Sequence, residues 1–378
     1  MPSTSIILLA FSLSITLQPI TAISFPPPTG PYNTSLLTTS LIDHHRLDPF
    51  APTNTSRTLM LSIFNPITPS TCSPIHSTYM NPATASFEDP RLTAFGLPDN
   101  LFETLTLRTC KPNPQTRRAT EFPVVLFSPA AGTTRLFYSA MAQQVASAGY
   151  RVIMLDHPYD VDIVTFPDNS TILGLDFIDD QTPLLVEIRA KDMSFVLDQL
   201  SQASVAKKLF PGTTCGINVS KAGVFGHSLG GAAAAEAMLF DKRFAGGVNL
   251  DGSMFGDVVK KGLKRPFMLF AHAGKNITTD PTWEAIWPKL TGWKRELMLA
   301  ESVHYTFSDL LDVLKVLGFG GMLPSEAVEI VGSIDGGRGL EVVTAYVTAF
   351  FDFVLKGKDA GILKRPSTAF PEVTFGLS

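Results

Sequence analysis

A serine flanked by glycines is the residue of this chain best placed to do chemistry. Residues 226–231 read Gly-His-Ser-Leu-Gly-Gly, which places Ser228 at the centre of a G-x-S-x-G pattern. An apolar run, Ala222–Phe225, precedes the pattern and an alanine-rich stretch, Ala232–Phe240, follows it, so the sequence predicts a strand, a tight turn and a helix. Glycine lacks the Cβ atom that would collide in such a turn, which holds the serine hydroxyl above the sheet. We therefore expect Ser228 to be a nucleophile rather than an unreactive serine in a glycine-rich turn.

A serine nucleophile needs a general base, and the chain offers only seven histidines. His304 follows the predicted strand Glu296–Leu299. This placement matches the chain order serine, acid, histidine that is usual after such a turn, so we expect His304 to be the base. An ordinary histidine at a helix start is the alternative. The others lie in N-terminal loops, after earlier strands or beside the serine: His44, His45, His76, His157, His227 and His272.

Two carboxylates could orient that histidine. Asp251 ends the predicted strand Gly247–Leu250, and Asp280 comes after the next strand, where many hydrolases of this type keep their acid. Carboxylates at strand ends are also common as simple caps. Position in the sequence alone leaves the two residues about equal.

Stabilising an oxyanion takes two main-chain N–H groups. One is expected from Leu229, the residue after the nucleophile. The other is expected from the loop Ser128–Gly132 after the first strand of the middle zone, and Ala131 is the residue we predict there. The alternative is that this loop is only a turn between a strand and a helix.

The elements that must position these residues alternate along the middle of the chain. Apolar runs rich in β-branched residues are separated by stretches with helical spacing, which predicts a mostly parallel sheet covered by helices on both faces. Besides those given above, the expected strands are Val124–Ser128, Tyr150–Leu155 and Phe267–Ala271, and the expected helices are Tyr138–Ala148 and Leu184–Leu200.

The flanking zones have a different character. Residues 23–120 are rich in Pro, Thr and Ser with short strand-like pieces, Thr58–Phe64 and Leu101–Arg108, which predicts antiparallel strands and long loops. Residues 306–355 look mainly helical. We expect one domain over 23–378, with an extension over 23–120, a catalytic core over 121–310 and C-terminal helices and a tail over 311–378. The long polar stretch Asp160–Pro183 is either a lid or a surface loop.

Composition narrows the class of protein. The chain has 378 residues, a net charge of −4, 17% charged residues and 45% hydrophobic residues. These values exclude a solvated disordered chain and make non-specific nucleic-acid binding a poor prediction. The apolar run Ile6–Leu17 is too short to cross a bilayer and predicts a signal peptide over 1–22, cleaved after Ala22. No later stretch looks transmembrane, so we expect a secreted, extracellular protein.

The cysteines and glycosylation patterns fit export. Cys72 and Cys110 both lie in the N-terminal zone and are the preferred disulfide pair, which leaves Cys215 unpaired; three free thiols are the alternative. No Cys or His spacing resembles a zinc site. Asn-x-Ser/Thr acceptor patterns occur at Asn33, Asn54, Asn169, Asn218 and Asn276.

Several stretches together resemble the plasma-type platelet-activating factor acetylhydrolases, especially their secreted fungal relatives. They are Phe122–Ser139 (FPVVLFSPAAGTTRLFYS), Ala146–Tyr159 (ASAGYRVIMLDHPY), Val224–Gly231 (VFGHSLGG), Gly247–Phe255 (GVNLDGSMF) and Ser302–Leu310 (SVHYTFSDL). In that family the acid follows the strand just after the nucleophile helix, so the resemblance implies Asp251 rather than Asp280. It also implies Ala131 as the loop donor. The usual His-Gly before that donor reads Pro129-Ala130 here, which puts the rim of the oxyanion hole in doubt.

The resemblance also implies a fold and an activity. The fold is that of the α/β-hydrolases, with an N-terminal strand and loop extension. The activity is calcium-independent hydrolysis of short or oxidised sn-2 acyl esters of glycerophospholipids, with no metal and no cofactor. The implied partners are a lipid-like ester and, transiently, lipid surfaces, and we expect a monomer.

Two other functions stay open. One is a general carboxylesterase, lipase or polyester hydrolase with the same residues. The other is a non-catalytic secreted binding protein, which the complete set Ser228, Asp251 and His304 disfavours.

Overall fold

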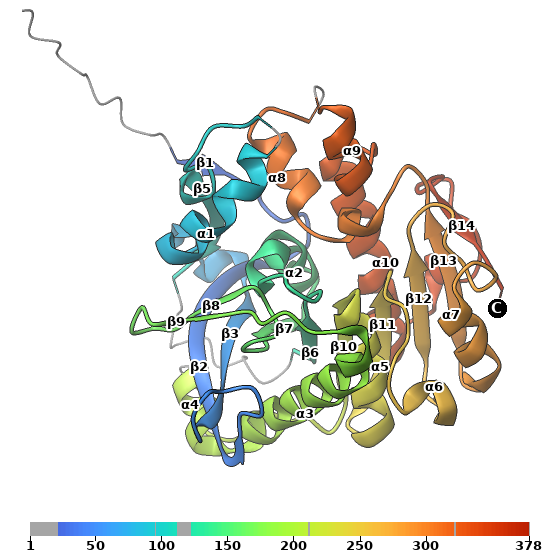
Figure 1. Cartoon of the computed structure of the whole chain (residues 1–378), viewed down its shortest axis with the longest axis horizontal. Coiled ribbons are helices and arrows are strands. Elements are labelled where there is room, and N and C mark those ends of the chain that lie inside the picture. The colour runs from blue at the N-terminus through green and yellow to red at the C-terminus, as the bar shows by residue number, and fades with distance from the viewer. Residues whose placement is uncertain (1–21, 95, 112–121, 211, 321–322, 378) are drawn as a thin grey trace, which may run out of the picture.

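A nine-stranded sheet runs through the molecule in the order β14-β13-β12-β11-β10-β6-β7-β3-β2 (Figure 1). The computed structural model describes residues 22–94, 96–111, 122–210, 212–320 and 323–377. Neighbouring strands from β7 to β13 are parallel, whereas β2, β3 and β14 join antiparallel. The sheet strands are β2 (Asn33–Leu47), β3 (Ser56–Ile67), β6 (Val124–Ser128), β7 (Arg151–Asp156), β10 (Ala222–His227), β11 (Phe244–Leu250), β12 (Phe267–Ala271), β13 (Lys294–Leu299) and β14 (Val373–Phe375).

Helices cover both faces of this sheet because successive residues of a strand point to opposite faces. In β6, Val125 and Phe127 belong to one buried apolar cluster, and Val124 and Leu126 belong to another. The first cluster includes residues of α1 (Pro82–Thr93), α2 (Ser139–Ser147), α8 (Leu310–Val316), α9 (Ser325–Val331) and α10 (Gly336–Lys356). The second includes residues of α3 (Thr182–Ser201), α4 (Ala203–Leu209), α5 (Leu229–Phe240), α6 (Val258–Lys261) and α7 (Pro281–Ile286). The expected α/β-hydrolase class of fold is confirmed.

The N-terminal zone is continuous with the central sheet. Its long strands β2 and β3 pair with each other, and β3 pairs with β7 of the core. A smaller sheet holds β1 (Ile23–Ser24), β5 (Leu105–Cys110) and β4 (Pro74–Thr78). The predicted disulfide Cys72–Cys110 is confirmed and ties the start of β4 to the end of β5, while Cys215 is free and exposed.

Some predicted boundaries were wrong for local reasons. The strand expected at Leu101–Arg108 begins only at Leu105, because a 3-10 turn occupies Phe102–Thr104. The helix expected from Ala232 begins at Leu229, since Gly230 and Gly231 are poor helix formers that hide its first turn in the sequence. The short strand β14 was not predicted, although its three residue types favour strands. It pairs with β13 at the edge of the sheet.

The stretch Asp160–Pro183 contains a small hairpin. Its strands are β8 (Ile163–Thr165) and β9 (Thr171–Leu173), which pair antiparallel as a separate two-stranded sheet. After β9 the chain continues into α3 (Figure 1). Among the described residues, no helix is long and apolar enough to cross a membrane. The predicted signal peptide lies outside the described residues, save for its final position.

Candidate active site

Ser228 stands on a strained turn between β10 and α5. Its backbone has φ 55° and ψ −124°, a conformation that costs a residue with a side chain on the order of 1–3 kcal/mol. Both flanking glycines are required by close approach. A Cβ on Gly226 would lie 2.3 Å from the carbonyl carbon of Gly230, and a Cβ on Gly230 would lie 2.0 Å from the carbonyl oxygen of Ser128. The sequence pattern therefore marks a turn that only these residue types can form.

Asp251 lies at the adjacent strand end. The register of β10 against β11 pairs His227 with Leu250. Ser228 directly follows His227, and Asp251 directly follows Leu250. The main-chain N–H of Ser228 donates to the carbonyl of Leu250 at 2.9 Å. Asp251 also has a positive φ, 60°, and its side chain is fully buried. Two strained residues thus stand side by side at the carboxyl edge of the sheet.

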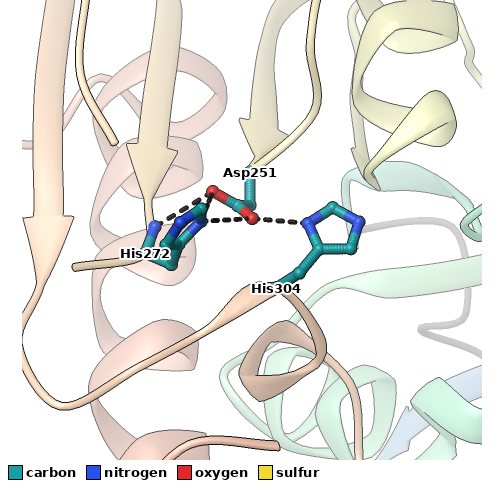
Figure 2. A group of neighbouring side chains, drawn as sticks. All are labelled: Asp251, His272 and His304. Atoms are coloured by element: carbon teal, nitrogen blue, oxygen red, sulfur yellow. Dashed lines mark hydrogen bonds and ion pairs between the residues drawn. The ribbon is translucent and has the colours of Figure 1, made fainter. Parts of the chain in front are cut away.

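His304 comes to the same edge from beyond β13. It begins the short 3-10 turn His304–Phe307, and its Nδ1 lies 2.5 Å from Oδ2 of Asp251 (Figure 2). A carboxylate only accepts, so Nδ1 carries the proton and Nε2 is the free basic atom. The ring also packs on His227, the residue before Ser228, with ring centroids 4.5 Å apart. The three residues expected to form a triad are therefore gathered at neighbouring strand ends.

A second histidine on the same carboxylate was missed by sequence reasoning. His272 directly follows β12, and its Nδ1 lies 2.7 and 2.8 Å from the two oxygens of Asp251 (Figure 2). Its main-chain N–H also donates to Oδ1 at 3.0 Å. The available signal was its position one residue past a strand that neighbours β11 in the sheet. The potential ligand atoms of Asp251, His272 and His304 lie within 4.8 Å of one another, so these three side chains could hold a metal ion.

These partners keep Asp251 ionised. Burial by itself would raise the pKa of its carboxyl, but hydrogen bonds from His272 and His304 and the nearby charge of Lys275 outweigh burial and hold the pKa well below its usual range. Lys275 donates to the main-chain carbonyl of Asp251 at 2.7 Å and pairs with Asp280 at 3.2 Å. A permanently charged carboxylate is suited to stabilise an imidazolium beside it.

Asp280, the other candidate acid, is occupied elsewhere. Its carboxylate caps α7, accepting from the N–H of Thr282 at 2.8 Å and of Trp283 at 3.3 Å. It also accepts from the hydroxyl of Ser253 at 2.6 Å. In the described parts of the chain it bonds to no histidine. The geometry places Asp251, and not Asp280, on His304.

The two expected oxyanion donors flank Ser228. Leu229 is the first residue of α5, and Ala131 lies in the loop after β6. Neither N–H has an acceptor among the described residues. It remains a prediction that the two N–H groups point toward one common position. Such an arrangement requires that neither N–H is already bonded to another acceptor.

A buried arginine holds the loop that carries Ala131. Arg189 of α3 donates from Nη2 to the carbonyl of Ala130 at 3.3 Å and from Nη1 to the carbonyl of Pro129. Its guanidinium also pairs with Asp160 through two bonds of 2.6 Å. In a trans peptide the C=O and N–H point in opposite directions. A cation that fixes the Ala130 carbonyl on one side therefore turns the Ala131 N–H to the other side. This residue also went unnoticed in the sequence.

Tyr138 and His227 support the same loop from the other side. The Tyr138 hydroxyl accepts from the N–H of Ala130 at 3.2 Å and lies 2.9 Å from Nδ1 of His227. Burial, followed by the charge of His304, lowers the pKa of His227 well below its usual value. His227 is therefore neutral, and its side chain is fully buried.

The chain is similar to known esterases along most of its length. The family model described as platelet-activating factor acetylhydrolase, isoform II, matches residues 96–171 and 213–359. A probable 1-alkyl-2-acetylglycerophosphocholine esterase of Arthroderma benhamiae is 34% identical over 374 residues, which cover 93% of each chain. The solved structure of a ferulic acid esterase from Streptomyces cinnamoneus superposes with a TM-score of 0.77 at 32% identity and covers 94% of this chain and 99% of its own. The chain is thus a carboxylic ester hydrolase that belongs to the platelet-activating factor acetylhydrolase, isoform II, family.

Proposed function

We propose that the protein is a secreted serine esterase that removes short or oxidised sn-2 acyl chains from glycerophospholipids through an acyl-enzyme on Ser228. The observation that carries this proposal is the 2.5 Å bond between His304 and the buried Asp251, beside the strained turn of Ser228. The fungal relative with a phospholipid esterase name supports the substrate class.

The proposed mechanism has two acyl-transfer steps. His304 Nε2 takes the Ser228 hydroxyl proton as Oγ attacks the ester carbonyl, and the oxyanion accepts from the N–H groups of Leu229 and Ala131. His304 then gives its proton to the leaving alcohol, which departs as the acyl-enzyme forms. Water repeats the sequence with the same base and releases the acid. Asp251 holds the ring and stabilises its charged form.

Apolar side chains beside Leu229 favour a lipid-like substrate. Leu229 packs in a small cluster with Leu185, Val186 and Ala232, against the half-buried rings of Phe50, Phe177 and Phe255. Exposed apolar side chains lie close to Phe177 in the sequence, at Leu173, Leu175, Ile178 and Leu184. We propose that Asp160–Pro183 is a rim that meets acyl chains or a lipid surface, rather than a passive surface loop.

The similarity to a ferulic acid esterase supports a second candidate, a carboxylesterase that acts on aromatic or simple esters. The two candidates use the same catalytic residues and differ in the alcohol and acyl groups they accept.

Hydrolysis rates across substrates test the proposal. The purified protein is given 1-alkyl-2-acetylglycerophosphocholine, analogues with longer sn-2 chains, methyl ferulate and p-nitrophenyl acetate, with Ser228→Ala as the control. We expect the highest kcat/KM on the acetylated phospholipid and a loss of about 10⁴-fold or more in Ser228→Ala. A higher kcat/KM on methyl ferulate would favour the second candidate. Equal fluorophosphonate labelling of wild type and Ser228→Ala would contradict a nucleophilic Ser228.

Secretion and processing are part of the proposal. We propose cleavage after Ala22, a single domain over 23–378 that acts as a monomer, and glycosylation at exposed acceptors. The side chains of Asn54, Asn169 and Asn218 are exposed. Expression in a fungal or yeast host checks this directly: N-terminal sequencing of the medium protein should begin at Ile23, and removal of N-glycans should lower its mass.

A further inference from the structure

We propose that Asp251, His272 and His304 form an inhibitory site for a divalent transition-metal ion, of which Zn²⁺ is the best fitted. Asp251 and His272 directly follow the neighbouring strands β11 and β12, and His304 lies beyond β13 in the 3-10 turn His304–Phe307. Figure 2 shows the two rings on either side of the Asp251 carboxylate. The proposed esterase mechanism needs only His304 as a base on Asp251, so the second ring on this carboxylate, that of His272, takes no part in proton transfer. The inhibition rests on the proposed function, whereas the metal binding does not.

The donor set matches zinc chemistry. Two imidazole nitrogens and one carboxylate oxygen are the ligands of many open zinc sites, in which water takes the fourth position. Oδ2 of Asp251 is the atom that both rings share, at 2.8 Å from Nδ1 of His272 and 2.5 Å from Nδ1 of His304. Ligand atoms of a tetrahedral zinc ion stand roughly 3.3 Å apart, given bond lengths of about 2.0–2.1 Å. The two rings therefore need to withdraw from Oδ2 of Asp251 by less than about 1 Å. Their own nitrogens, which lie within 4.8 Å of each other, need to come to roughly 3.3 Å apart.

The rings are free to make that movement. The side chains of His272 and His304 are 30% and 40% exposed, whereas that of Asp251 is fully buried. An ion can thus arrive from solvent, and the two histidines can rotate while the carboxylate stays fixed. The neighbouring cation Lys275 is paired with Asp280, which reduces its repulsion of a metal ion.

Metal binding would disable the base through a proton shift. Coordination requires the lone pair of Nδ1 on each ring, so each Nδ1 proton moves to Nε2 of the same ring, with no net change in protonation. His304 then carries its proton on Nε2, the atom that must accept the proton of Ser228. The hydrogen bond from His304 to Asp251 is also replaced by the metal. Bound Zn²⁺ therefore removes general-base catalysis while the fold stays intact.

Inhibition by ZnCl₂ tests the proposal. Wild-type hydrolysis of p-nitrophenyl acetate should fall by more than about tenfold at saturating Zn²⁺ and recover on adding EDTA. In His272→Asn, with each rate expressed relative to that variant's own uninhibited rate, the Zn²⁺ concentration for half inhibition should rise by about 10- to 100-fold or more. The matched control is the double variant His44→Asn/His45→Asn, which removes two exposed histidines distant in sequence from the three ligands. The Zn²⁺ concentration for half inhibition should be the same in this control as in the wild type.

Binding is measured apart from activity in Ser228→Ala, which retains all three ligands. Equilibrium dialysis should give one Zn²⁺ per chain, and Co²⁺ should give the visible absorption of a low-symmetry site. Adding His272→Gln to Ser228→Ala should abolish both signals, with thermal unfolding used to confirm that the double variant is folded. A wild type that keeps its activity in saturating Zn²⁺, or equal inhibition of wild type and His272→Asn, would overturn the proposal. If the wild-type protein binds one Zn²⁺ per chain but hydrolyses no ester, the metal site is supported and the proposed function is refuted.

Discussion

At the scale of single residues, the centre of the site is one carboxylate with three hydrogen-bond donors. Asp251 accepts from the ring and the N–H of His272 and from the ring of His304. Charge-assisted hydrogen bonds of this kind are about twice as strong as neutral ones. They offset the burial of Asp251 and the strain of its positive φ. The same three bonds fix the carboxylate in the orientation that the base requires.

Replacing each candidate acid should separate their roles. In Asp251→Asn the amide cannot stabilise an imidazolium and can favour the wrong histidine tautomer, so we expect kcat to fall by about 10³- to 10⁴-fold. In Asp280→Asn we expect a loss below about tenfold with little change in Tm, because asparagine caps a helix about as well as aspartate. Steady-state kinetics and thermal unfolding of both variants check this. A larger kcat loss in Asp280→Asn than in Asp251→Asn would show that the acid is misassigned.

At the scale of elements, α3 does more than cover the sheet. It places Arg189 beneath the loop after β6, where the side chain is fully buried and bonds to Asp160 and to two loop carbonyls. A charged donor on the Ala130 carbonyl polarises the peptide whose N–H belongs to Ala131. The helix thereby helps to orient an expected oxyanion donor in another segment of the chain.

Arg189→Met should lower kcat by about 10²-fold with little change in KM, because an oxyanion donor acts mainly in the transition state. It should also destabilise the fold by about 3–5 kcal/mol, since Asp160 is left as an unpaired buried charge. The control is the double variant Arg189→Met/Asp160→Leu, which removes both charges. Its Tm should recover while its kcat stays low, and recovery of both would mean that Arg189 acts only through stability.

The Cys72–Cys110 disulfide should stabilise the N-terminal sheet. It closes a loop with a sequence separation of 38, for which the chain-entropy relation gives about 4 kcal/mol. We expect Cys72→Ser/Cys110→Ser to lower Tm markedly in thermal unfolding. Cys215→Ser, which removes the exposed free thiol, is the matched control and should unfold at the wild-type temperature.

At the scale of the whole molecule, buried charges connect the N-terminal zone to the core. Arg57 of β3 and His157 after β7 both bond to Asp192 of α3, at 2.7 and 2.9 Å. His157 bonds in turn to the hydroxyl of Ser128 at the end of β6, at 2.9 Å. Because β3 pairs directly with β7 as well, strands β2 and β3 of the N-terminal zone are built into the central sheet.

This network should make stability fall in mild acid. Burial, opposed by the hydrogen bond to Asp192, lowers the pKa of His157 below its usual 6.5. The unfolded chain therefore binds more protons below about pH 6.5, and the free energy of unfolding falls there by up to about 1.4 kcal/mol per pH unit for this group. Arg57 and His157 outweigh burial and hold the pKa of Asp192 far below its usual value in the folded chain. Its contribution to stability therefore begins to fall only below about pH 4, where the carboxyl of the unfolded chain takes up a proton.

Thermal unfolding between pH 7.5 and 5.5 checks the sign and the residue. Tm of the wild type should fall over this range, and His157→Gln, whose amide can still bond to Ser128 and Asp192, should show a smaller fall. His44→Asn removes an exposed histidine and should show the wild-type fall. A His157→Gln curve parallel to that of the wild type would place the titrating group elsewhere.

Residue types and their local spacing were enough to predict the class of fold and to propose the site residues. The strand, glycine turn and helix around Ser228 follow from residue types within about ten positions, and β12 was predicted with its observed bounds. His304 and Asp251 could be proposed because strand ends are readable from apolar runs. In parallel strands those ends meet at one edge of the sheet. The pair Cys72–Cys110 was also chosen correctly from its place in the N-terminal zone.

Contacts between groups that are distant in the sequence follow from the packing of the whole molecule. Residues alone left Asp251 and Asp280 equal, and the contact with His304, 53 residues away from Asp251, depends on strand order and register. Arg189 carried no sequence signal of its role, because it reaches the site from a helix. The strand-end position of His272 did not by itself show which carboxylate it contacts. Sequence periodicity reports how a segment folds locally, whereas the meeting of two such segments is fixed by the packing of the whole sheet.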